Sequence, residues 1–100
     1  MDIITLKKSS LEKAFRSHKI ERAYLFGSFA SGANDQESDV DFLVSFQEGL
    51  EPETKGKLWW ELYDELKKIL GKEVDILTES SLKNPYFIQE INNTKKLIYG

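Results

Sequence analysis

The residues best suited to chemistry lie between Leu25 and Val44, where the chain reads LFGSFASGANDQESDVDFLV. Asp39 and Asp41 are two positions apart where apolar and polar residues alternate, so both carboxylates should leave one face of a strand. Two such charges repel by about 2–3 kcal/mol at an effective dielectric near 20, and no Lys or Arg lies between Gly27 and Phe46 to offset the repulsion. Divalent cations would reverse its sign, and carboxylates that hold paired cations are typical of phosphoryl transfer.

Two further features belong with this pair of acids. Asp75 lies in a second segment of the same alternating pattern, and it would join Asp39 and Asp41 if the two strands were neighbours with their apolar faces toward the core. Gly27 and Ser28 follow directly after an apolar segment, where a glycine lets the backbone approach a polyphosphate and N–H and hydroxyl groups can hold its oxygens. Each feature alone is more typical of an ordinary turn or solvated strand, but the ordered set indicates a metal-dependent phosphate site.

The elements that must position these residues follow from periodicity and end signals. Ser9 with Glu12 has the pattern of a capping box and predicts a helix whose apolar face includes Leu11, Ala14 and Phe15. A longer helix is predicted over Thr54–Leu70, and a short one after Asn84 and Pro85. The segments predicted to be extended are Ile20–Phe26, Val40–Phe46, Glu73–Thr78 and the edge strand Lys95–Tyr99. The loop from Ser28 to Ser38 has room for one helical turn near Phe29 and Ala30.

This order predicts an α/β (α+β) fold with a small mixed sheet of three to four strands flanked by helices, in one domain over residues 1–100. The net charge is -3, and Arg16 and Arg22 are the only arginines, so we expect no direct binding to nucleic acid. The absence of cysteine excludes disulfides and thiol catalysis. No apolar run is long enough to span a membrane, and we expect a cytoplasmic protein.

One ordered pattern resembles the signature of the DNA-polymerase-β-like nucleotidyltransferases. It consists of Gly27-Ser28, ten intervening residues, Asp39-x-Asp41 and a later strand acid. A chain this short is similar to the minimal nucleotidyltransferases, many of which are antitoxins of HEPN-domain proteins. The resemblance covers Tyr24 to Tyr99 and implies a nucleotidyltransferase fold. One departure concerns the loop, because many relatives read Gly-Ser-Arg-Ala-Arg-Gly where this chain has Phe29 and Ser31 in place of the arginines.

The resemblance also implies roles. Asp39, Asp41 and Asp75 would be the catalytic, metal-binding acids and would hold two Mg²⁺ ions. Gly27 and Ser28 would hold the β- and γ-phosphates of ATP, and we assign Gly32 and Ser38 to the same nucleotide-binding set. The implied reaction is transfer of AMP from ATP to a hydroxyl, most simply a tyrosine of a HEPN-type toxin partner.

Two alternatives stay open at this point. A catalytically weak antitoxin would neutralise its partner by contact alone, which the missing loop arginines favour. A small-molecule acceptor would require a second chain to complete its pocket, because 100 residues leave no room for an added acceptor domain.

Overall fold

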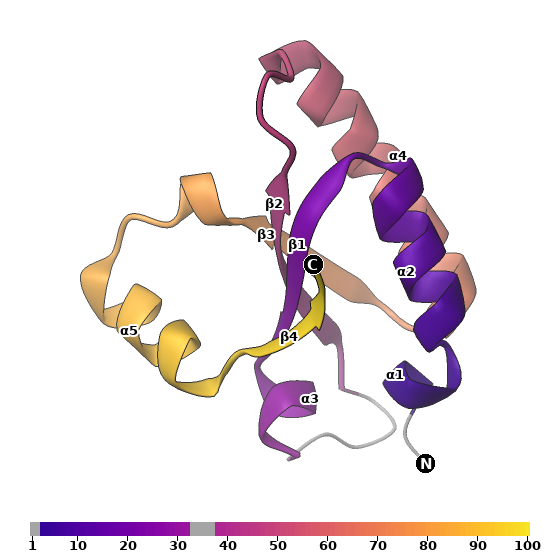
Figure 1. The fold of residues 1–100 in the computed structure, drawn as a ribbon. Helices are drawn as coiled ribbons and strands as arrows, with labels where there is room; N and C mark the ends of the chain where they lie inside the picture. The colour runs from indigo at the N-terminus through magenta and orange to yellow at the C-terminus, as the bar shows by residue number, and fades with distance from the viewer. Residues whose placement is uncertain (1–2, 33–37) are drawn as a thin grey trace.

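The computed structural model of the chain describes residues 3–32 and 38–100. Helices and strands alternate along it (Figure 1). The elements, in chain order, are α1 (Ile3–Leu6), α2 (Lys8–Ser17), β1 (Ile20–Phe26), α3 (Ser28–Ser31), β2 (Val40–Phe46), α4 (Pro52–Leu70), β3 (Val74–Thr78), a 3-10 turn (Glu79–Ser81), α5 (Pro85–Thr94) and β4 (Lys96–Tyr99).

The four strands form one mixed sheet in the order β3-β2-β1-β4. β1 is antiparallel to both β2 and β4, whereas β2 and β3 are parallel. The parallel pair requires a crossover, and α4 supplies it. This architecture confirms the predicted small mixed sheet flanked by helices, with β4 at an edge as expected.

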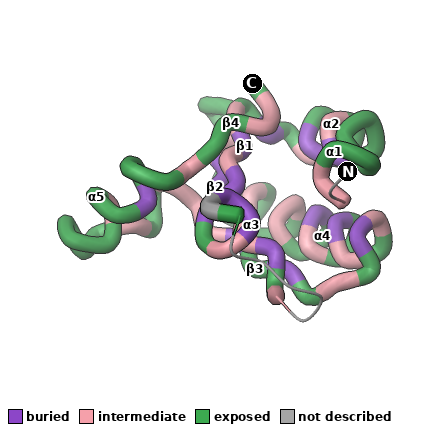
Figure 2. Tube along the Cα trace, turned by 90° about the horizontal axis from the view of Figure 1, so that it is seen from below, coloured by how far each residue is buried: buried purple, intermediate pink, exposed green. Residues whose placement is uncertain are grey.

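The two faces of the sheet are covered very differently. On one face, α2 and α4 pack their apolar stripes against alternate strand residues to form the main core, which includes Phe15, Phe42, Val44, Leu62 and Leu66. On the other face, a smaller cluster of Phe26, Leu43 and Ile91 packs under α5. Figure 2 shows α5 standing on the opposite side of the sheet from α2 and α4, and exposed along most of its length.

The strand predictions are confirmed, and two helix starts are corrected. Ser9 is not an N-cap, because α2 already begins at Lys8. Lys7 is the N-cap and makes no side-chain capping bond. Its carbonyl accepts the Leu11 N–H at 2.9 Å, the first hydrogen bond of the helix, so Ser9 lies inside the first turn. α4 begins at Pro52 rather than Thr54, because proline fixes a helical φ and needs no N–H partner at the first position.

The short helix α5 starts as predicted. The Asn84 side chain accepts the backbone N–H groups of Tyr86 and Phe87 at 2.9 and 3.3 Å, which is the N-cap arrangement that its sequence indicates. In the part of the chain that the structure describes, no helix is long and apolar enough to cross a membrane.

Candidate active site

Two of the predicted acids are direct neighbours across the sheet. Asp41 of β2 is the register partner of Asp75 of β3. Register partners on adjacent strands point to the same face, and here that face is opposite to the main core, because Val40, Phe42, Val74 and Ile76 belong to the main core. The two acids therefore share the face that carries α5. Asp39 lies two residues before Asp41, just outside the strand, and is exposed.

Electrostatic interaction joins all three acids. The pKa of Asp41 is raised above its usual value, first because the half-buried carboxyl loses solvation, then because of the negative charges of Asp75 and Asp39. The carboxylate of Asp41 thus interacts with both other acids, and Asp41 and Asp75 share one face of the sheet.

Gly27 lies beside the Asp41 carboxylate. Its backbone adopts φ 71° and ψ -147°, a region open almost only to glycine. A Cβ at this position would lie 3.3 Å from the Asp41 Cγ and closer still to one carboxylate oxygen. Phe26, the residue before it, is the cross-strand partner of Asp41. The end of β1 therefore lies beside Asp41, an approach of distant residues that the sequence motif alone does not reveal.

The remaining predicted site residues surround this point. Ser28 opens α3 and is half-buried, and Gly32 ends α3 in the left-handed conformation, at φ 81°. Ser38 is half-buried directly before Asp39. The loop expected between Ser28 and Ser38 falls partly on residues 33–37, which lie outside the described residues. The phosphate-binding roles of these residues remain predictions.

The donor set fits magnesium in its chemistry. Among residues 3–32 and 38–100, no three His, Cys, Asp or Glu side chains converge closely enough to hold a metal ion by themselves. Mg²⁺ does not require this, since it is usually held by one or two carboxylates together with waters and substrate phosphates. The mutual repulsion at Asp41 is the condition that a bound cation would relieve. Asp39, Asp41 and Asp75 are the residues that would hold it.

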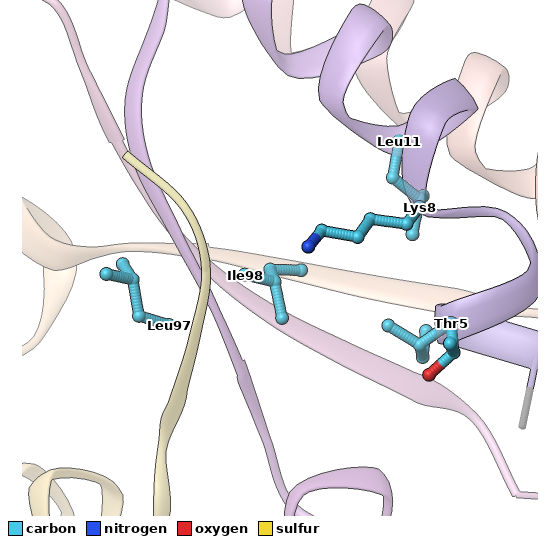
Figure 3. Close-up of a pocket in the computed structure, with 6 residues that line it drawn as sticks. Thr5, Lys8, Leu11, Leu97 and Ile98 are labelled. Atoms are coloured by element: carbon cyan, nitrogen blue, oxygen red, sulfur yellow. The ribbon is translucent and has the colours of Figure 1, made fainter.

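Two hollows beside β4 lie away from the three acids, none of which is among their lining residues. One cavity of about 210 Å³ lies between the N-terminal helices and β4, and Figure 3 shows the Lys8 side chain extending across it toward Ile98. An adjoining hollow of about 340 Å³ includes Phe29 and Gly32. Ile98 and Leu11 pack on the main core, so the first cavity opens on the face opposite to the acids.

The family model described as polymerase beta, nucleotidyltransferase matches residues 9–100. It covers nearly all of the chain, including the glycine–serine turn and all three acids. The chain belongs to this nucleotidyltransferase family. The resemblance inferred from the motif is thereby confirmed.

Individual family members are similar over most of their length. A Methanocaldococcus jannaschii protein, named as a candidate protein adenylyltransferase, is 42% identical over 82 residues, which are 82% of this chain and 78% of that protein. The protein adenylyltransferase MntA of Thermococcus cleftensis is 37% identical over 82 residues, covering 82% of this chain and 76% of that protein.

Chains in solved toxin–antitoxin structures share the fold. A crystal structure of a toxin–antitoxin with AMP-PNP contains a chain with a TM-score of 0.72 and 26% identity, and the match covers 93% of this chain and 73% of that one. A Shewanella oneidensis complex of a tri-AMPylated HEPN toxin with its MNT antitoxin has a TM-score of 0.66 over 96% of this chain and 71% of that one. At 24% identity, this second likeness shows the fold alone.

Proposed function

We propose that this nucleotidyltransferase transfers AMP from ATP to a protein hydroxyl, with Mg²⁺ held by Asp39, Asp41 and Asp75. The observation that carries the proposal is the register of Asp41 with Asp75 on one face of the sheet, directly beside Gly27. Relatives named protein adenylyltransferase, at up to 42% identity, support the same activity.

In the proposed reaction, the acceptor oxygen attacks the α-phosphorus of ATP. A P–O bond to the acceptor forms, the bond from the α-phosphorus to the bridging oxygen breaks, and pyrophosphate leaves. Asp75 lies within β3 and is exposed. It receives the hydroxyl proton. The backbone at Gly27 and the Ser28 hydroxyl hold the outer phosphates, and Gly32 and Ser38 complete the nucleotide-binding loop. Bound Mg²⁺ would supply charge neutralisation for the phosphates and the leaving group.

We further propose that the acceptor is a tyrosine of a HEPN-type toxin and that this chain is its antitoxin. A solved chain of the same fold, 26% identical, comes from a crystal structure of a toxin–antitoxin with AMP-PNP, a non-hydrolysable ATP analogue. The proposal places residues 1–100 in one minimal nucleotidyltransferase domain that acts in the cytoplasm, where ATP and Mg²⁺ are available.

The test is an AMP-transfer assay with the full chain. Incubation with α-labelled ATP, Mg²⁺ and the HEPN-domain protein encoded beside it should label that protein. The variant Asp41→Asn should abolish labelling while the two proteins still bind each other. Wild-type chain that binds the partner without labelling it would refute the enzymatic proposal.

One observation favours a second candidate function. Phe29 and Ser31 stand where many relatives carry arginines, which removes two cations from the predicted phosphate loop. In this alternative, the chain neutralises its toxin by contact alone. The double variant Asp39→Ala with Asp41→Ala separates the two functions, because only the contact mechanism survives this change in a toxin-neutralisation assay.

A further inference from the structure

The helix α5 differs from the other two long helices in its surface chemistry. Glu90 is the only charged residue among its ten, whereas α2 and α4 carry charged residues throughout. Ile91 is its only buried residue, while Tyr86 is 83% exposed and Phe87 is 39% exposed. The outward-facing residues are otherwise uncharged amides, such as Gln89 and Asn93.

This composition is typical of a protein–protein interface rather than of a solvated helix. Interface cores are depleted of charge and enriched in tyrosine, phenylalanine and tryptophan, with polar groups at the rim. A ten-residue helix is also marginal in water without packing on its apolar side. With only Ile91 buried, α5 gains little of that packing from the described part of its own chain.

A chain of contacts connects α5 with the acids. The Phe87 ring meets the Phe26 ring edge-to-face, with centroids 6.4 Å apart. Phe26 is in turn the register partner of Asp41 and precedes Gly27. Leu43 and Leu77, two residues beyond Asp41 and Asp75 on their strands, lie in or against the same small cluster under α5. The exposed aromatic residues therefore continue directly from the acid face.

We propose that the outer face of α5, anchored by Tyr86 and Phe87, is the surface on which the protein carrying the acceptor hydroxyl docks. The inference rests on the proposed function, because a protein that presents a hydroxyl to Asp41 and Asp75 must lie against the face of the sheet that α5 shares. α2 and α4 pack on the other face of the sheet (Figures 1 and 2).

The experiment compares Tyr86→Ala with Trp60→Ala. Both remove an exposed aromatic side chain, and Trp60, 62% exposed on α4, serves as the matched control on the opposite side of the sheet. Three quantities are measured with the full chain and the HEPN-domain protein. These are the Kd of the two proteins without ATP, the KM for the partner and the KM for ATP in the transfer assay.

We expect Tyr86→Ala to raise both the Kd and the KM for the partner by at least about tenfold, as for an aromatic hot-spot residue. The KM for ATP should stay unchanged, and Trp60→Ala should behave as wild type. Equal Kd values for wild type and Tyr86→Ala would overturn the inference. So would an effect confined to the KM for ATP, which would make Tyr86 a nucleotide contact, or a loss with Trp60→Ala instead.

The two proposals fail differently. Wild-type chain that binds the partner but transfers no AMP refutes the enzymatic function, while the Kd comparison still decides where the partner docks. Transfer that is equally efficient with wild type and Tyr86→Ala leaves the function intact and refutes the docking surface.

Discussion

Replacement of Gly27 by alanine should lower the rate of AMP transfer much more than it lowers the stability of the fold. At φ 71° and ψ -147°, a residue with a Cβ is strained by about 1–3 kcal/mol. The Cβ would also meet the Asp41 carboxylate, whose Cγ would be 3.3 Å away. Because the carboxylate is the free end of a short side chain, it can rotate away at little expense in stability, but it then leaves its position beside Asp75.

The expected stability change is moderate. In a domain of this size, each kcal/mol lowers Tm by about 4–8 °C. A loss of about 1–3 kcal/mol leaves a protein of ordinary stability folded. Circular dichroism at about 40 °C below the wild-type Tm should therefore still show the native helix content.

The expected loss of activity is much larger than the loss of stability would explain. Displacement of a catalytic group by about 1 Å is enough to lower a rate about 10²-fold, and we expect at least this loss in AMP transfer by Gly27→Ala. Gly71→Ala is the matched control, because Gly71 also has a positive φ, of 64°, but a Cβ there meets nothing within 4 Å. This control should lose about 1–2 kcal/mol of stability and keep its transfer rate.

Two results would contradict this reasoning. Gly27→Ala that is destabilised but fully active would show that the position of the Asp41 carboxylate beside the glycine turn does not matter for transfer. A comparable loss of rate in Gly71→Ala would show that general destabilisation, not local geometry, lowers the activity.

Two other changes follow from particular contacts. Because the pKa of Asp41 is higher in the folded chain than its usual 3.8, the folded state binds more protons than the unfolded state between these two values, and the free energy of unfolding falls as pH rises through that window. In metal-free buffer, the stability of Asp41→Asn relative to wild type should therefore increase as pH rises through the same window. Urea titration at several pH values measures this. A stability difference between the two proteins that does not change with pH would contradict the raised pKa of Asp41 as its cause. Trp59→Phe removes the indole N–H that donates to the Ile76 carbonyl at 3.1 Å, so it should lower the free energy of unfolding by about 0.5–1.5 kcal/mol, whereas Trp60→Phe, at an exposed position, should leave it unchanged.

Much of the site could be predicted because it depends on local periodicity. Alternation along Val40–Phe46 and Val74–Thr78 determines which residues face the core, so the acids at 41 and 75 had to lie on the opposite side of their own strands. The same local rules located the start of α5 through the Asn84 side chain. They failed at Ser9, because α2 begins one residue earlier, at Lys8, and places Ser9 inside the first turn.

The neighbours of each strand, and the register between them, depend on long-range packing. Periodicity gives each strand two faces but does not say that β3 lies parallel to β2 with Asp75 opposite Asp41, since that depends on how α4 packs across the sheet between them. The approach of Gly27 to Asp41, and of Phe87 to Phe26, likewise joins residues far apart in the chain. Local sequence therefore determined the kinds of residue available and the faces they occupy, whereas long-range packing determined the distances between them, because those distances depend on contacts that no single segment contains.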